Sequence, residues 1–314
     1  MRANYLSIRT EDAYVNWCAD LFAWAKCGDL SCLNEKLVER FLTHLAVERK
    51  VSASTQNQAF NALLFLFRRV LDKEFGKIAS ERVQRLARVP EWLTRDEIVV
   101  LLSALDGDWK LLAQIGYGTG LRLMELLRLR VKDVDFGNRL IFVRDGKGGK
   151  DRIVILPASL VMPLRIRVEK TIVLHKADLE AGYGSVFMPN LLAKKYPKAA
   201  SESKWQYLFP SRKICRSEDG VMRRHHLFPN GFQTELRKAA IRAKIGKRVH
   251  PHILRHSFAT HFLENGGNLQ ILQKLMGHKD VATTMIYTHC VNLNSATSPL
   301  DCLTRSRNEP MAEE

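Results

Sequence analysis

Four separated clusters of the sequence contain side chains that could cleave a phosphodiester bond without a metal ion. In the first, Gly118-Thr119-Gly120-Leu121-Arg122, a glycine turn expected at 116–120 leads into a helix. The N–H groups of that helix and the guanidinium of Arg122 could face one anion. Glu125, one turn later, could hold the arginine in place. By itself, the cluster also fits a surface arginine beside a tight turn.

The second cluster is His252-Ile253-Leu254-Arg255-His256. The i, i+3 spacing puts His252 and Arg255 on one face of a helix and leaves the two apolar residues between them for the core. His252 and His256 could instead bind a metal ion, but no acidic or cysteine third ligand lies near them in the sequence. We therefore expect no metal site and no cofactor.

The third cluster is Leu275-Met276-Gly277-His278-Lys279, followed nine residues after His278 by Tyr287. The segment 268–287 could also be a helix-turn-helix that reads DNA. That alternative explains this segment alone and leaves Arg122 and the His252/Arg255 pair without a role.

The fourth cluster is a basic hairpin tip. Two β-prone runs, 140–143 and 152–156, flank Asp145-Gly146-Lys147-Gly148-Gly149-Lys150, which predicts a hairpin with a mobile tip. A lysine such as Lys147 on a glycine-rich turn could protonate a leaving oxygen, or could simply contact phosphate. Lys150 and Arg152 are further candidate DNA contacts.

The charge of the chain favours a polyanionic partner. Its 49 Lys and Arg exceed its 33 Asp and Glu, giving a formal net charge of +16, and nucleic acid is the leading candidate. The run 237–255 has seven Lys or Arg and no acidic residue, so Lys247 and Arg248 are candidate phosphate contacts or part of a solvated helix face. The charge alone would also fit a ribosome-associated protein or a soluble protein that is simply basic.

The cysteine pattern and the lengths of the apolar runs indicate where in the cell the protein works. The six cysteines contain no CxxC pair, which favours reduced thiols over a disulfide framework or a zinc site. No apolar run approaches the roughly 18–20 residues that span a bilayer, and we find no signal-peptide pattern. We therefore expect a soluble cytoplasmic protein with no membrane partner.

The pattern of apolar residues predicts how the elements are organised. Residues 8–80 indicate a compact helical unit with three helices. The first contains Tyr14, the second covers 34–49 and the third begins near Ser54. A charged stretch follows, and Thr94 with Glu97 forms a capping box that opens the next helix. Further helices are expected at 121–128, 158–179, 233–243 and through most of 255–288. The sequence thus predicts a mainly α-helical fold with a small antiparallel β-sheet.

The order Arg…Lys…His-x-x-Arg…His…Tyr resembles the tyrosine recombinase or phage integrase family. The likeness includes GTGLRLMELLRL, HPHILRHSFATH and LMGHKDVATTMIYTH, and it extends over the catalytic half. It implies a helical core-binding domain that clamps DNA at 1–86, a linker at 87–93 and a catalytic domain at 94–314.

The resemblance also implies a role for each residue. Tyr287 would attack the scissile phosphorus and form a 3′-phosphotyrosyl bond. Arg122, Arg255, His252 and His278 would hold the nonbridging oxygens, and Lys147 would protonate the leaving 5′-oxygen. Four protomers on two DNA sites, a homotetramer, would complete recombination, and the segment after Tyr287 is a candidate for packing on a neighbouring subunit.

The resemblance narrows to the integron integrases, which belong to bacterial mobile genetic elements. It rests on YLSIRTEDAYVNW, on FLTHLAVERKVSASTQNQAFNALLFLFRRVL and on an insert at about 183–229 that contains KKYPKAASESKWQYLFPS and GVMRRHHL. Members of this group have further residues ahead of the point matching Tyr5, so we expect a truncated first helix and an incomplete clamp.

The insert mixes aromatic faces with positive charge, a combination that can stack unpaired bases. By similarity it would recognise bases flipped out of a folded single-stranded attachment site on a gene cassette. The candidate residues are Trp205, Arg223, Arg224, His225 and His226. Alternatively, Trp205, Tyr207 and Phe209 form a small core. Other readings of the chain are a Xer-like or phage-type recombinase of duplex sites, a type IB topoisomerase and a catalytically impaired DNA-binding relative.

Overall fold

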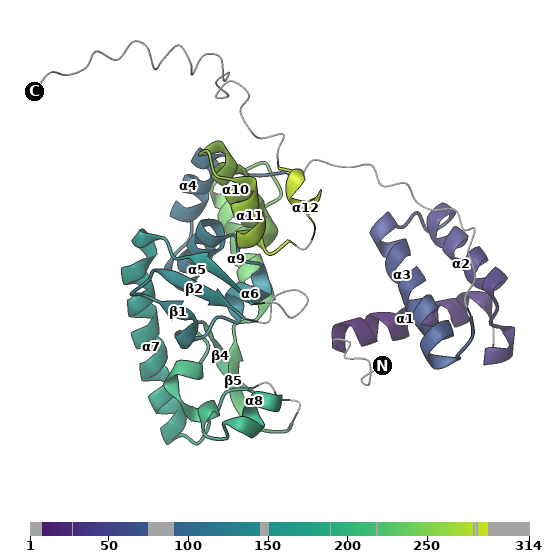
Figure 1. The fold of residues 1–314 in the computed structure, drawn as a ribbon, viewed down its shortest axis with the longest axis horizontal. Coiled ribbons are helices and arrows are strands. Elements are labelled where there is room, and N and C mark those ends of the chain that lie inside the picture. Colours follow the sequence, from purple (N-terminus) through teal and green to yellow (C-terminus); the bar gives the residue numbers. More distant parts are fainter. Residues whose placement is uncertain are drawn as a thin grey trace, which may run out of the picture. The chain divides into compact units, whose positions relative to one another are not determined.

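The chain folds into two compact units, residues 1–88 and 89–314 (Figure 1). The computed structural model describes residues 8–26, 28–74, 91–144, 151–188, 190–217, 219–278, 280 and 282–287. Most of the described residues are helical, and the strands form small antiparallel sheets. The predicted fold class, mainly α with a small antiparallel sheet, is confirmed.

The first unit is helical. It contains α1 (Ile8–Ala25), α2 (Glu35–Val47), α3 (Ala53–Phe65) and a π-helical turn at Leu66–Val70. Helix α2 begins after Asn34, whose side chain accepts a hydrogen bond from the Leu37 amide at 2.9 Å. One face of α2 is apolar at the i, i+3, i+4 and i+7 positions and packs with Leu21 and Leu63 into the core of this unit.

The second unit is built around one apolar core covered by helices. Helix α4 (Arg95–Ser103) begins with the predicted capping box, because Thr94 Oγ1 accepts from the Glu97 amide and the Glu97 carboxylate accepts from the Thr94 amide. The helices that follow are α5 (Gly107–Thr119), α6 (Leu123–Leu127), α7 (Val161–Glu180), α9 (Pro229–Arg242), α10 (Pro251–Glu264), α11 (Leu269–Met276) and α12 (Ala282–Met285).

A three-stranded antiparallel sheet adjoins this core. Strand β1 (Val134–Asp135) pairs with β2 (Leu140–Val143), which pairs with β3 (Arg152–Ile155) in the register Val143 to Arg152. Val154 points into the core, whereas its neighbours in β3 are exposed or half-buried. The predicted hairpin is therefore present, and its tip at residues 145–150 lies outside the described residues.

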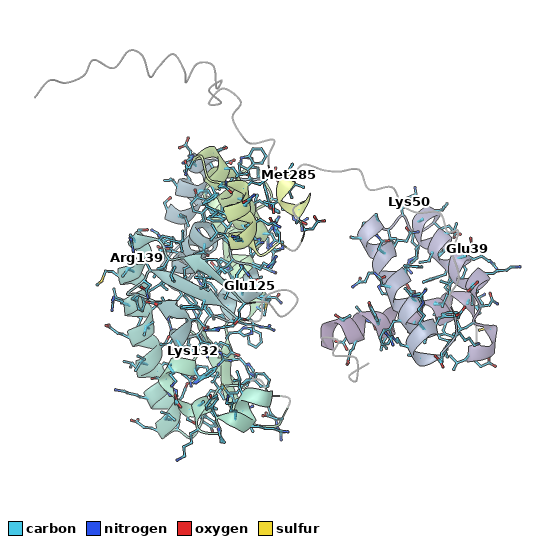
Figure 2. The ribbon with its side chains drawn as sticks, in the orientation of Figure 1. Glu39, Lys50, Glu125, Lys132, Arg139 and Met285 are labelled. Atoms are coloured by element: carbon cyan, nitrogen blue, oxygen red, sulfur yellow. The ribbon has the colours of Figure 1, made fainter. Side chains whose placement is uncertain are left out.

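The insert forms a subdomain at the end of this unit opposite α10 and α11 (Figure 1). It contains α8 (Asn190–Lys195) and a two-stranded sheet of β4 (Pro210–Arg216) and β5 (Met222–His226). The Leu208 amide donates to the Leu129 carbonyl at 2.7 Å, which ties the insert to the chain just after α6. Figure 2 shows Lys132 on the insert side of Glu125.

Three local expectations need correction. Gly116 and Gly118 lie within α5 and do not form a turn; the chain turns at Gly120 alone, which has φ +65°. Leu93, placed at the end of the linker, is fully buried in the core of the second unit. The six cysteines were expected to be reduced thiols; Cys18 and Cys215 are, but Cys32 is disulfide-bonded. No described helix combines the length and apolar character that crossing a bilayer requires.

Candidate active site

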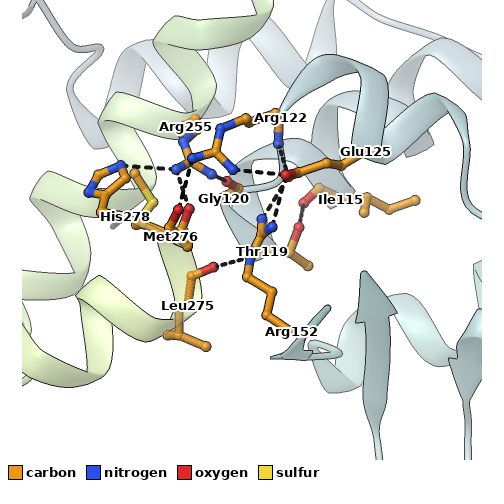
Figure 3. A network of polar contacts seen from close by, with 11 residues as sticks. Ile115, Thr119, Gly120, Arg122, Glu125, Arg152, Arg255, Leu275, Met276 and His278 are labelled. Atoms are coloured by element: carbon orange, nitrogen blue, oxygen red, sulfur yellow. Dashed lines mark hydrogen bonds and ion pairs between the residues drawn. The ribbon is translucent and has the colours of Figure 1, made fainter. Parts of the chain in front are cut away.

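Arg122 lies immediately before α6 and is bonded to Glu125 (Figure 3). Its Nη1 donates to Glu125 Oε1 at 2.8 Å, and its backbone amide donates to Oε2 at 2.9 Å. Its Nη2 donates to the Gly277 carbonyl at 3.1 Å, which connects α6 to the end of α11. Glu125 is thus bonded to Arg122, and its supporting role in the reaction stays a prediction.

The Glu125 carboxylate also binds Arg152 of β3. Nη1 and Nη2 of Arg152 donate to its two oxygens at 2.8 and 2.6 Å, and Nε donates to the Leu275 carbonyl at 2.8 Å. Burial would raise the pKa of Glu125, but the hydrogen bonds from Arg152 and Arg122 outweigh it and lower the pKa to about 2. Glu125 is therefore ionised and shared by two guanidiniums.

Arg255, on the first turns of α10, is buried and held by backbone carbonyls. Its Nη1 donates to the carbonyl of Gly120 at 2.5 Å, and its Nη2 donates to the carbonyl of Met276. Burial, followed by the charge of Arg122, lowers the pKa of Arg255 to about 9, which leaves it cationic at neutral pH. Two guanidiniums thus lie in one pocket between α5, α6, α10 and α11 (Figure 3).

His278, just after α11, contacts the same guanidinium. Its Nε2 lies 3.0 Å from Arg255 Nη2, and its Nδ1 lies 2.8 Å from the hydroxyl of Thr284. Burial and the charges of Arg255 and Arg122 lower the pKa of His278 to about 4. Because a guanidinium can only donate, Nε2 accepts here and the ring proton is on Nδ1.

Tyr287 is almost fully buried, at 3% exposure, in an apolar cluster between α10 and α11. Its hydroxyl lies 2.7 Å from Nδ1 of His256, one residue after Arg255. The ring of His252 lies on the same helix, 6.1 Å from that of His256 between centroids. Partial burial of the ring, followed by the charge of Arg255, lowers the pKa of His252, although the residue as a whole keeps an exposed surface. The phenol, three imidazoles and both arginines therefore occupy one region of the second unit.

Two predicted site residues, Lys147 and Lys150, lie outside the described residues. Of the other predicted phosphate contacts, Arg248 is exposed, whereas Lys247 is bonded to Glu97 at 2.6 Å. Arg152, proposed as a DNA contact, has a guanidinium engaged by Glu125 and Leu275, and only 10% of its side chain is exposed. We assign Arg152 to the support of the arginine pocket, because a surface contact would require it to leave a buried ion pair.

Two of the predicted DNA contacts in the insert, Arg223 and Arg224, form ion pairs. Arg224 binds Asp178 of α7 through two nitrogens, at 2.5 and 2.7 Å, and Arg223 binds Asp219. Arg224 therefore holds the insert to α7, which is a structural position and not an open phosphate contact. For Arg223 a DNA contact stays a prediction.

The aromatic residues of the insert divide between two environments. Phe209 lies in the main core, whereas Tyr207 and Trp205 belong to a small cluster of the insert. The ammonium of Lys132 lies 3.0 Å from the centre of the Trp205 ring. His225 bonds to Ser217 at 2.9 Å and His226 to the Leu227 carbonyl at 2.8 Å. The base-stacking role of these residues stays a prediction.

Sequence reasoning missed the contact between His256 and Tyr287 and treated His256 only as a possible metal ligand. Among the described residues, no group of three His, Cys, Asp or Glu side chains is arranged to hold a metal ion. The one signal that could have found it is the place of His256 directly after Arg255. The helix turns this side chain toward the segment after α11, which contains Tyr287. Spacing along one helix could not reveal which distant side chain it meets.

Comparison with known proteins identifies the family. Residues 91–292 match the model of the phage integrase family, and residues 1–77 match its N-terminal SAM-like domain. The chain belongs to the phage integrase family of tyrosine recombinases. It is 42% identical over 310 residues to an integrase/recombinase of Escherichia coli, covering 96% of this chain and 91% of that protein. It is also 36% identical to tyrosine recombinase XerA of Thermococcus onnurineus, covering 79% and 75% of the two chains.

Solved structures of tyrosine recombinases share the fold of this family member. The Tn1549 transposon integrase, in complex with transposon right end DNA, aligns with a TM-score of 0.62 at 17% identity and covers 98% of this chain and 95% of that one. The XerH site-specific recombinase bound to its difH substrate aligns with a TM-score of 0.56 at 22% identity, covering 96% and 79%. The family is thus supported by sequence, and the fold by structure.

Proposed function

We propose that this recombinase cleaves and rejoins DNA through a 3′-phosphotyrosyl bond to Tyr287. The observation that carries the proposal is the 2.7 Å contact of the Tyr287 hydroxyl with His256, the neighbour of Arg255. This contact brings Tyr287, the last described residue, beside α10, the helix that carries Arg255. The protein's DNA partner is proposed from the same chemistry and from the DNA complexes of its structural relatives.

In the proposed reaction, the phenol oxygen attacks the scissile phosphorus and the bond to the 5′-oxygen breaks. Arg122 and Arg255 hold the nonbridging oxygens, where charge accumulates in the transition state. Among the described residues, no contact uses the Nε–H of either arginine, so each keeps a donor for phosphate. Lys147 protonates the leaving oxygen.

His278 has to change its hydrogen bonds to take part. Its Nε2 accepts from Arg255, so it can donate to phosphate only after this contact breaks and the ring proton moves or a second proton binds. A phosphate entering between Arg255 and His278 supplies the negative charge that favours this change. His252, exposed on the first turn of α10, needs no such release.

Two guanidiniums can supply the charge that a divalent cation supplies in many nucleases, so we propose that the reaction needs no metal ion. The test is the formation of the covalent protein–DNA adduct in EDTA. An unchanged rate is expected, and a rate restored only by added magnesium contradicts the proposal.

The substrate we propose is an integron attachment site, including the folded single strand of a gene cassette. The support is the insert, where Trp205 is half-buried beneath Lys132 and packs in one small cluster with Tyr207. The ring of Tyr207 lies 5.3 Å from that of His226 between centroids. An aromatic face beside a cation can stack an unpaired base. Cassette integration and excision would be carried out by a homotetramer in the cytoplasm of a bacterium, at the nucleoid.

A second candidate is a Xer-like recombinase that acts on duplex sites. It is favoured by the 36% identity to XerA, which covers 79% of this chain. The two candidates differ in the form of DNA they prefer, so the choice can be made by experiment.

The experiment offers the protein two pools of nicked DNA with the same randomised segment. One pool is duplex, and the other consists of single strands folded into hairpins with extrahelical bases. Covalent adducts are isolated in SDS, and their DNA is sequenced to identify the cleaved site. Enrichment of hairpins with a defined unpaired base supports the integron proposal. Capture from the duplex pool alone overturns it in favour of the Xer-like alternative.

A further inference from the structure

The hydroxyl of Tyr287 meets an imidazole to which the mechanism above gives no role. His256 lies in the second turn of α10, half-buried, and its Nδ1 is 2.7 Å from the phenol oxygen. The two rings are tilted, with centroids 5.8 Å apart. This geometry is a hydrogen bond along the ring edge, not a stacking contact.

The surroundings of His256 decide which partner donates. Burial, followed by the charges of His252, His250 and Arg255 on the same helix, lowers the pKa of His256 to about 4. At neutral pH the ring is uncharged, and its Nδ1 can serve as an acceptor. The hydroxyl of Tyr287 then donates to Nδ1, and the ring proton lies on Nε2.

The other imidazoles of the site are placed differently. His278 has both nitrogens engaged, by Arg255 and by Thr284. His252 is exposed, and among the described residues no hydrogen bond joins it to Tyr287. Of the imidazoles that the structure describes, His256 is therefore the one placed to receive a proton from the phenol.

We propose that His256 orients the phenol of Tyr287 and takes its proton during attack on phosphorus. This inference rests on the proposed function, in which Tyr287 is the nucleophile. As the bond from the phenol oxygen to phosphorus forms, the phenol proton moves to Nδ1. The bond to the 5′-oxygen breaks, and that oxygen takes its proton from Lys147. Religation reverses both transfers, so no other reactant is needed.

DNA binding makes His256 a better base. Burial is the main reason why the imidazolium of His256 is disfavoured in the free protein, and the charges of His252, His250 and Arg255 add to it. A phosphate held by Arg255 brings a negative charge that offsets these positive charges. The pKa of His256 then rises toward neutrality, where a general base is most effective. Besides the groups of α10, Tyr287 and His278 are the charged or titratable groups that face His256 in the part of the chain that the structure describes.

The experiment compares adduct formation by two variants of the full chain on a nicked site recovered from the randomised pools. His256→Asn keeps a hydrogen-bond acceptor near the position of Nδ1 but cannot take a proton, and His256→Ala removes both functions. We expect both to lose about 10²- to 10⁴-fold in adduct rate, with DNA binding retained. Added imidazole should partly restore His256→Ala.

The matched control is His261→Asn. His261 lies on the same helix, and its Nδ1 likewise bonds a tyrosine hydroxyl, that of Tyr117, at 2.9 Å. It lies outside the proposed machinery, so the rate of the folded control should stay near that of wild type. The comparison separates the loss of a proton acceptor from the loss of a buried histidine–tyrosine pair.

The pH profile provides a readout that a merely structural role would not change. In wild type, adduct rate should fall as acid protonates His256, and this limb should be absent in His256→Asn. A His256→Asn rate equal to wild type, or an unchanged acidic limb in this variant, overturns the inference. Failure of the proposed function is distinct, because wild type would then form no more adduct than Tyr287→Phe. If neither His256 variant folds, the wild type alone decides: an adduct rate that does not change between about pH 4 and 8 overturns the inference.

Discussion

Arg152 binds the Glu125 carboxylate with both terminal nitrogens, at 2.8 and 2.6 Å, while Arg122 binds the same carboxylate from the other side. Arg152 belongs to β3, the strand that follows the hairpin tip carrying Lys147. Glu125 belongs to α6, which begins next to Arg122. One buried carboxylate therefore connects the strand after the proposed general acid to Arg122, one of the two arginines proposed to hold phosphate.

The first prediction concerns the cost of breaking this pair. Arg152→Met leaves a buried carboxylate with one partner fewer, and Glu125→Gln leaves two guanidiniums without their anion. Each single variant should lose about 3 kcal/mol or more of the free energy of unfolding. The double variant should lose less unfolding free energy than the sum of the two single losses. Both charges of the Arg152–Glu125 pair are then absent, so neither of them is left buried without the other.

Chemical denaturation of the four proteins measures this coupling, with Arg165→Met as control. Arg165 is an exposed arginine of α7 whose guanidinium lies over the ring of Phe136. Its replacement should change the free energy of unfolding by less than about 1 kcal/mol. Strictly additive effects of the two site substitutions would mean that Arg152 and Glu125 do not stabilise each other.

The second prediction is a dependence of stability on pH. The pKa of Glu125 is lowered from 4.5 to about 2 in the folded protein. A lowered folded-state pKa gives stability that is complete above pH 4.5 and is lost as the pH falls toward 2. The difference in unfolding free energy between wild type and Glu125→Gln should shrink by about 3 kcal/mol over this range. A difference that is constant with pH would show that Glu125 does not hold this low pKa.

The third prediction concerns Gly120, whose carbonyl accepts from Arg255. Its φ of +65° is costly for other residues, and an added Cβ would lie 2.5 Å from the ring of Phe258. Gly120→Ala should therefore cost about 2 to 4 kcal/mol of unfolding free energy and slow cleavage by displacing the arginine.

Gly246→Ala is the matched control, because nothing lies within 4 Å of its added Cβ. Thermal unfolding and adduct formation are measured for both variants. Equal melting temperatures for the two would contradict the close approach of Phe258 to Gly120.

Much of this arrangement follows from local sequence patterns, and the failures have specific physical reasons. The capping box at Thr94 and the hairpin at 140–156 depend on neighbours in the chain and were predicted correctly. The turn expected at 116–120 is shorter in the structure, because Gly116 and Gly118 continue α5. There they pack so closely that an added Cβ would lie near Leu254 at Gly116 and near Pro157 at Gly118. The pairings of Arg152 with Glu125 and of His256 with Tyr287 join residues 27 and 31 positions apart, and no local pattern specifies them.

The fourth prediction tests the insert. Trp205→Ala should weaken binding of a folded hairpin with an unpaired base by about 5- to 150-fold, as loss of one stacked base implies. Binding of the duplex should change little. The control is Tyr196→Ala, which removes an exposed aromatic ring near the end of α8 that does not lie under Lys132. Equal weakening of hairpin and duplex by Trp205→Ala would count against base stacking.

The most direct test of the central claim is to identify the residue that carries the DNA. Trypsin should release the segment 280–305 from the covalent adduct. Tyr287 is the only tyrosine of that segment. After nuclease digestion, mass spectrometry should find a 3′-linked nucleotide on that tyrosine in wild type and none in Tyr287→Phe. A nucleotide on any other residue, or an adduct that persists in Tyr287→Phe, would contradict the account.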